Sequence, residues 1–152
     1  MDAVGKLKQI VAQAPSLLAA ISPEEASAQP APGKWSKKQE LGHLVDSACN
    51  NHQRVVRAQL EEQPSLDDYD GERWVALHDY QAMDWSEIIE SWRMMNQHLI
   101  RAASITSPRT SERKLWVGGG NPVTLGVLVS DYVGHLLHHL HHIGVDFAPG
   151  AK

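Results

Sequence analysis

Histidine is the residue type that first suggests chemistry in this sequence. The chain has nine histidines, and five of them fall within the eight residues from 135 to 142. His135 and His139 are four residues apart, a spacing that an α-helix places on one face. Such a pair lets one helix offer two imidazoles to a single metal ion. A third protein ligand would leave one coordination position open, as catalytic zinc sites do.

The same stretch also has less specific interpretations. In a segment so rich in histidine this spacing also arises by chance, and the imidazoles could be solvated or lie in an interface. His142 shares the helical sector of His135 and His139, whereas His138 and His141 point elsewhere and are expected on the surface. From this helix alone, metal ligation and a structural role have equal support.

A third ligand must come from another part of the chain. The candidates are the remaining histidines, His43, His52, His78 and His98. His43 lies well over a right angle from the apolar stripe of its helix, so periodicity alone predicts that it is exposed. Yet Ser47, Asn50 and Arg54 share its side and form a polar ridge. Such a ridge suits a polar cavity inside a bundle as well as a solvated face, and the residues leave both possibilities open.

Four segments with helical periodicity must position these residues. They are predicted at about 2–21, 36–60, 84–102 and 124–145, with Ser36 and Thr124 as N-caps. The Pro-rich connector 22–33 is predicted to be non-helical, residues 72–77 to form a short helical turn, and residues 106–123 to contain a hairpin. The fold expected is all-α, an antiparallel four-helix bundle with longer connections and a small hairpin before the last helix. The extra length of the connections could cover a site at one end.

The composition of the 152-residue chain limits the possible partners. We expect residues 1–147 to form a single domain and residues 148–152 a loose tail. The net charge of -4 argues against a general nucleic-acid binder, and the apolar runs are much shorter than the roughly 20 residues of a membrane span. Cys49 is the only cysteine, so no internal disulfide forms, and the N-terminal residues do not resemble a signal peptide. We therefore expect a cytoplasmic protein.

Three stretches of the chain resemble the DinB/YfiT-like metalloenzyme family. The first runs from Gly33-Lys34-Trp35-Ser36 through Glu40 to Ser47 and includes Asn50 and Arg54, the second holds Tyr69-Asp70 and Trp74, and the third runs from His135 to Ile143. The last is similar to the His-x-x-His-His-x-x-His-Ile ending of the YfiT branch. The order and spacing agree over about residues 33–143. The resemblance implies a four-helix bundle, often a homodimer, that binds zinc or nickel through His43, His135 and His139.

The resemblance also implies a reaction class. Three neutral imidazoles leave a divalent ion its full charge, so a bound water reaches a pKa of about 7 and a carbonyl is polarised. The first hypothesis is a metal-dependent hydrolase of a small-molecule amide or ester. One alternative is a metal-dependent thiol S-transferase that uses a low-molecular-weight thiol, and another is a non-catalytic metal-binding stress protein. No Glu lies between His135 and His139, where zinc peptidases place their general base, so the catalytic residues stay unassigned.

Several further residues are candidates for the surroundings of the ion. Asp46 or Asp131 could orient a ligand imidazole, and Arg54 could hold an anionic group of the substrate. A pocket that contains the positive Arg54 and the aromatic Trp74 would suit a bound thiol. Asn50 and His142 complete this predicted pocket, although surface charge and helix capping are equally good interpretations for the charged members.

Overall fold

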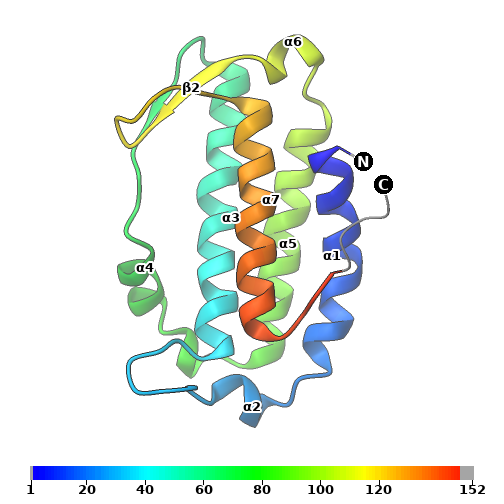
Figure 1. The fold of residues 1–152 in the computed structure, drawn as a ribbon, viewed down its shortest axis with the longest axis vertical. Coiled ribbons are helices and arrows are strands. Elements are labelled where there is room, and N and C mark those ends of the chain that lie inside the picture. Colours follow the sequence, from blue (N-terminus) through cyan, green and yellow to red (C-terminus); the bar gives the residue numbers. More distant parts are fainter. Residues whose placement is uncertain (1, 148–152) are drawn as a thin grey trace.

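The computed structural model describes residues 2–147, in which four long helices form a bundle (Figure 1). These are α1 (Ala3–Ala19), α3 (Lys37–Leu60), α5 (Trp85–Ser104) and α7 (Leu125–Ile143). Helix α3 packs between α5 and α7, and α1 contacts the same two helices from the other side. Helices α1 and α7 run antiparallel to α3 and α5 (Figure 1). The predicted all-α four-helix bundle is confirmed, whereas the predicted tail at 148–152 lies outside the described residues.

The ends of α3 and α7 follow local capping rules. The Ser36 hydroxyl accepts from the Gln39 backbone N–H, and the Gln39 side chain accepts from the Ser36 backbone N–H, which completes a capping box. Thr124 caps α7, as the sequence predicts. Gly144 ends α7 with a φ of 93°, a left-handed conformation that glycine adopts without strain. These caps fix where α3 begins and where α7 begins and ends.

The core consists of the apolar stripes of the four helices. Trp85 and Trp92 of α5 are buried in it, as their periodicity predicts. Burying polar groups is costly unless they find partners, so the positions of buried polar side chains are informative. Apart from Asn96, those described lie on α3 or at its cap: Ser36, Lys38, His43, Asp46, Ser47 and Asn51. Helix α3 is therefore the element on which a polar site is built.

The connections contain more regular structure than the sequence predicts. The connector 22–33 is not entirely non-helical, because Pro23–Ser27 forms α2, with Pro23 at its first position and Ser22 as its cap. The predicted turn at 72–77 is the longer α4 (Gly71–His78), which the short 3-10 helix η1 (Tyr80–Ala82) follows. None of the helices within residues 2–147 is both long and apolar enough to cross a bilayer.

A small sheet closes one end of the bundle. The predicted hairpin is confirmed as β2 (Lys114–Val117) and β3 (Val123–Thr124), which pair antiparallel after the short helix α6 (Pro108–Ser111). A third strand, β1 (Ser65–Leu66), pairs parallel with β2 and was not predicted, because two residues carry no periodicity. This pairing holds the start of the long connection after α3 at one end of the bundle. The connection then runs back along α3 and brings α4 to its outer side (Figure 1).

Candidate metal centre

Three imidazoles converge in the groove between α3 and α7. His43 lies in the second turn of α3, and His135 and His139 lie one turn apart on α7. The two Nε2 atoms of His43 and His135 are 3.1 Å apart, and one ring nitrogen from each of the three histidines lies within 4.8 Å of the others. The structure thus brings together the three histidines that the sequence analysis named. The expectation from periodicity that His43 is exposed is wrong, because α7 packs over its polar ridge and leaves it only 8% exposed.

The geometry of this cluster fits a divalent cation. Two imidazole nitrogens bound to a tetrahedral zinc ion at about 2.0–2.1 Å lie about 3.3 Å from each other. The 3.1 Å separation of the His43 and His135 nitrogens is close to that distance. Within the described residues, the buried Nδ1 of His43 has no hydrogen-bond partner. A buried imidazole whose polar contacts are other imidazoles gains little from them in a core, and an ion that both rings can bind explains the arrangement better.

The protonation state of the cluster suits ligation. Burial lowers the pKa of His43 to about 4, and the positive charge that His139 can carry acts in the same direction. Burial, followed by the charges of His139 and His43, likewise lowers the pKa of His135 to about 4. The nearby Glu40 carboxylate favours the charged form of both rings but does not outweigh these effects. Both imidazoles are therefore neutral at physiological pH, the form that a metal requires.

Glu40 is a site residue that the sequence analysis missed. The Nδ1 of His139 lies 2.6 Å from Glu40 Oε2, and both side chains are about 15% exposed or less. Burial acts to raise the pKa of Glu40, but the hydrogen bond and charge of His139 outweigh it, so the pKa is lowered and the carboxylate is ionised. An ionised carboxylate only accepts, so a neutral His139 carries its proton on Nδ1 and has its Nε2 lone pair free for a metal.

A signal for Glu40 was available in the sequence. Glu40 precedes His43 by three residues, so the two lie on the same side of α3. An acidic residue in the first turn of a helix is also common for electrostatic reasons, so this spacing alone does not assign Glu40 to the site.

Neighbouring segments cover His43. Gly71 opens α4 directly against it: a Cβ at that position would lie 3.0 Å from His43 Cε1 and 3.2 Å from Nδ1. Helix α4 can approach this closely because Gly71 has no side chain. The ring of Trp35 lies 5.2 Å from the His43 ring, and Ser47 Oγ lies 3.4 Å from Nδ1 of His135. The His43 side of the cluster is thus covered by the start of α4 and by the segment that precedes α3.

Asp46, predicted as a residue that orients a ligand, contacts other partners. The Tyr80 hydroxyl donates to Asp46 Oδ1 at 2.7 Å, and Nδ1 of His78 lies 3.1 Å from the same oxygen. Burial raises the pKa of Asp46 despite these two contacts. Its hydrogen bonds therefore attach η1 and α4 to α3 instead of orienting the three clustered histidines.

The other predicted pocket residues divide into two groups. Asn50 donates its amide to the Asp46 backbone carbonyl, and Trp74 packs against Tyr69 with ring centroids 5.4 Å apart. Within the described residues, neither has a hydrogen bond or ring contact with the three clustered histidines. His142 is closer to the cluster. Its Nδ1 lies 3.6 Å from Glu40 Oε1, and its side chain is 43% exposed. His138 and His141 are exposed, as the sequence analysis expected.

A small cavity of about 210 Å³ extends from His135 along the groove between α3 and α7. It is lined by Ser47, Asn51, Arg54, Tyr69, Leu128, Asp131, Tyr132 and His135. Asn51 takes the place on the ridge that the sequence analysis gave to Asn50. Arg54 and Asp131, both named from the sequence, face the same space as a clustered histidine, so this cavity is where a small molecule can reach the site.

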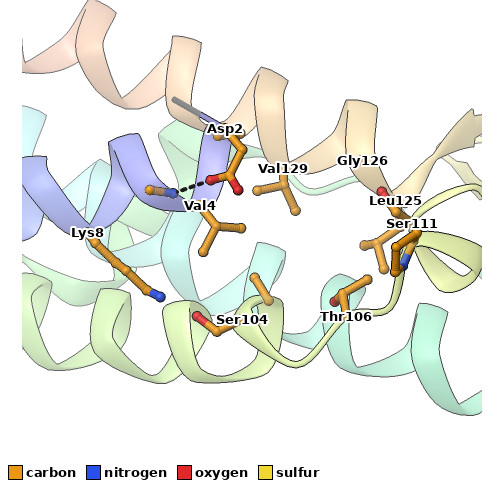
Figure 2. Close-up of a pocket in the computed structure, with 13 residues that line it drawn as sticks. Asp2, Val4, Lys8, Ser104, Thr106, Ser111, Leu125, Gly126 and Val129 are labelled. Atoms are coloured by element: carbon orange, nitrogen blue, oxygen red, sulfur yellow. Dashed lines mark hydrogen bonds between the residues drawn. The ribbon is translucent and has the colours of Figure 1, made fainter. Parts of the chain in front are cut away.

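A second cavity lies elsewhere on α7 and differs in chemistry. It measures about 500 Å³ and is formed by the start of α1, the end of α5, the segment that follows α5 and the first turns of α7 (Figure 2). Val4, Leu125 and Val129 contribute apolar surface, and Lys8, Ser104 and Thr106 contribute polar groups. Its 13 lining residues, all within the described part of the chain, include neither histidine nor cysteine. This cavity offers no ligands for a metal of the kind that the first site presents.

Comparison with known proteins matches most of the chain to one family. The family model of the DinB superfamily matches residues 6–143. A Bacillus licheniformis protein named "Putative metal-dependent hydrolase" is 29% identical over 143 residues, which span 92% of this chain and 80% of that protein.

Two solved structures share the fold. YfiT from Bacillus subtilis, described as "a probable metal-dependent hydrolase with an unusual four-helix bundle topology", superposes with a TM-score of 0.73 at 18% identity, over 95% of this chain and 87% of YfiT. A mycothiol-dependent maleylpyruvate isomerase superposes with a TM-score of 0.76 at 12% identity, over 94% of this chain and 60% of the isomerase. At these identities the similarity establishes the bundle alone.

Proposed function

This chain belongs to the DinB superfamily, and we propose that it is a metal-dependent hydrolase that holds one divalent ion through His43, His135 and His139. The observation that carries the proposal is the convergence of three imidazole nitrogens within 4.8 Å of one another between α3 and α7. The relatives named as metal-dependent hydrolases give the reaction class independent support. We assign the ion as zinc or nickel, since both accept imidazole ligands.

The residues around the ion have distinct roles in this proposal. When bound, a divalent ion supplies Lewis-acid chemistry that activates water and polarises the carbonyl of an amide or ester. The burial of His43 and His135 keeps both rings neutral, and the Glu40 carboxylate fixes the tautomer of His139. Gly71 and Trp35 enclose His43, which limits the access of bulk water from that side.

The thiol S-transferase remains the second candidate. The specific observation in its favour is the shared fold with a mycothiol-dependent isomerase, whose name identifies its thiol. The cavity next to His135 could admit the end of such a thiol, with Arg54 as a positive contact. The third candidate, a metal-binding protein without turnover, predicts the same metal content and no reaction.

One experiment separates these classes. The metal-loaded protein is screened against small amides and esters without thiol, and against electrophiles with and without added low-molecular-weight thiols. A hydrolase cleaves some member of the first set without thiol. Turnover that requires a thiol supports the transferase, and inactivity in both arms with an ion bound supports the binding protein. The proposal is wrong if the only turnover seen requires a thiol.

We further propose that the protein acts in the cytoplasm as a homodimer on a small-molecule substrate, without nucleic acid or membrane partners. Light scattering during size-exclusion chromatography measures the mass in solution directly. A single species near twice the 16.8 kDa chain mass supports the dimer, and a species at the chain mass contradicts it.

A further inference from the structure

We propose that the cavity beside His135 binds a carboxylate of the substrate and that Arg54 recognises it. This inference rests on the proposed function, because it names the substrate class: an amide or ester that carries one carboxylate a short chain away from the bond to be cleaved. Four features of the cavity support it, namely the state of Arg54, the weakness of its present partners, the polar path to the histidines and the charge of the lining.

Arg54 is a largely buried cation without a strong partner. Its side chain is only 12% exposed, and it lines the cavity. Its contacts within the described residues are a 3.5 Å hydrogen bond from Nη2 to the Asp67 carbonyl, a 3.5 Å approach of Nη2 to Asp68 Oδ1, and a position 5.7 Å above the Tyr69 ring. A guanidinium has five N–H donors, and these contacts use one of its three nitrogens. A burial of this degree is costly unless the remaining donors find an acceptor.

The partner on the rim is easily replaced. The Asp68 side chain is 74% exposed and meets Arg54 through a single nitrogen at 3.5 Å. An ion pair with so exposed a carboxylate contributes little, because water competes for the charge of Asp68. A substrate carboxylate inside the cavity can instead accept two parallel N–H bonds from the planar guanidinium, which is the stronger geometry.

A polar path joins Arg54 to the clustered histidines. His43, Ser47, Asn51 and Arg54 follow one another on one side of α3 at spacings of four, four and three residues. Ser47 lies beside His135, and Arg54 is two helical turns further along, about 10 Å on the helix axis. A substrate whose reacting carbonyl lies at the histidines therefore reaches Arg54 through a short chain. The carboxylate cannot be directly attached to that carbonyl.

The size and charge of the cavity restrict the anion. Its volume of about 210 Å³ is below the range of roughly 300–1,000 Å³ typical of small-molecule sites, so it accepts a small group. Arg54 is the basic and Asp131 the acidic side chain in its lining. The negative charge of Asp131 disfavours a dianion such as a phosphate ester. One carboxylate matches the single cation, Arg54. The small volume thus excludes a bulky group in the cavity, and the charge of the lining excludes a doubly charged one.

The test uses the metal-free protein, so that a carboxylate cannot bind through the ion. Butyrate is the probe and butyramide its neutral counterpart, and binding is followed by shifts of the backbone amide resonances of Ser47, Asn51 and His135. We expect butyrate, and not butyramide, to shift these resonances. Arg54→Gln should weaken butyrate binding about tenfold or more, as expected for loss of a charged hydrogen-bond pair. Arg57→Gln is the matched control, because Arg57 lies one turn further along α3 and pairs with Glu61 at 2.6 Å outside the cavity.

The results separate this inference from the proposed hydrolase. Equal butyrate affinity in wild type and Arg54→Gln, or no butyrate binding by the wild type, overturns the inference whatever the protein catalyses. Arg54-dependent binding of butyrate in a protein that takes up no ion leaves the inference standing and refutes the metal site. Where hydrolysis is found, Arg54→Gln should raise KM for carboxylate-bearing substrates and leave KM for their methyl esters unchanged. An equal rise for both also overturns the inference.

Discussion

Helix α7 borders two cavities, and each has a buried polar atom without a partner in the described residues nearby. Beside the histidine cluster this atom is Nδ1 of His43, and at the larger cavity of Figure 2 it is Oγ1 of Thr106. Three nitrogens that can bind a metal converge near His43 Nδ1. The Thr106 hydroxyl, in contrast, is a single polar group among apolar and scattered polar side chains. The cavity next to the histidines has less than half the volume of the other. The convergence of nitrogens that can bind a metal, and not the volume of a cavity, thus distinguishes the site at which chemistry is expected.

The strongest test of this difference is to remove the histidines one at a time. We expect His43→Ala, His135→Ala and His139→Ala each to lower the affinity for zinc or nickel more than about a thousandfold. Each variant leaves only two imidazoles to bind the ion. Metal content per chain after dialysis measures this. His138→Ala and His141→Ala are the matched controls, since both rings are exposed on the same helix. Loss of metal in His138→Ala with retention in His139→Ala would show that the assigned face of α7 is wrong.

Removal of the ion should have the next largest effect. A ligand that binds only the folded state at about a thousand times its Kd stabilises that state by about 4 kcal/mol. At pH 7.5 we therefore expect metal-loaded protein to unfold at higher denaturant concentration than protein stripped with a chelator. The Ser104→Ala variant, altered in the other cavity, should show the same difference. Equal stability with and without the ion would contradict a labile ion at the histidines.

Acid should destabilise the metal-free protein through the buried rings. The pKa of His43 and of His135 is about 4 in the folded chain and about 6.5 when unfolded, so the unfolded chain binds more protons between these values. Their stabilising effect is fully present above about pH 6.5 and is lost as the pH falls through about 4. The loss is about 1.4 kcal/mol per pH unit for each histidine. Denaturant unfolding between pH 7 and pH 4 measures it, and His135→Ala should reduce the slope while His141→Ala should not.

Loss of the Glu40 carboxylate should weaken the site without abolishing it. Residues that hold the second nitrogen of a ligand imidazole typically contribute 10–100-fold to metal affinity. We expect Glu40→Gln to lower zinc affinity by about that factor, because an amide no longer provides the charged acceptor for His139 Nδ1. Competition with a zinc indicator measures the change. Glu61→Gln, which alters an acid near the other end of α3, should have no effect; unchanged affinity in Glu40→Gln would remove Glu40 from the site.

The smallest effect is expected at the other cavity. Thr106→Val removes a buried hydroxyl without a partner at little change in shape, so stability should stay equal or rise by up to about 1 kcal/mol. Metal affinity should be unchanged. Ser111→Ala, on the same cavity, serves as a control for altered lining. A change in metal affinity in Thr106→Val would mean that the two regions are coupled along α7.

Much of the fold could be predicted because it depends on local rules. The capping box at Ser36, the Thr124 cap and the stripe that buries Trp92 depend on residues close in sequence. The strand β1 and the helix α2 could not be predicted in the same way. A two-residue strand forms only because β2 lies beside it, and a five-residue helix is too short to show a period.

The site shows the same division between local and long-range information. His135 and His139 could be paired from their spacing on one helix. The place of His43 depends on α7, 92 residues away, packing over a polar ridge of α3, and periodicity predicts the opposite. The contact of Glu40 with His139 spans 99 residues, so the spacing of Glu40 from His43 indicates a shared side of α3 but not the partner on α7. Family resemblance supplied His43, whereas Glu40 required the structure.

Anomalous scattering from a crystal of untreated protein, recorded at the zinc and nickel absorption edges, tests the central claim most directly. Our account predicts one strong peak per chain at bonding distance, about 2.0–2.1 Å for zinc, from Nε2 of His43, His135 and His139. The peak should coincide with one of the two edges, which also identifies the ion. A peak held by other residues, or no peak in protein crystallised with equimolar zinc and nickel, would contradict it.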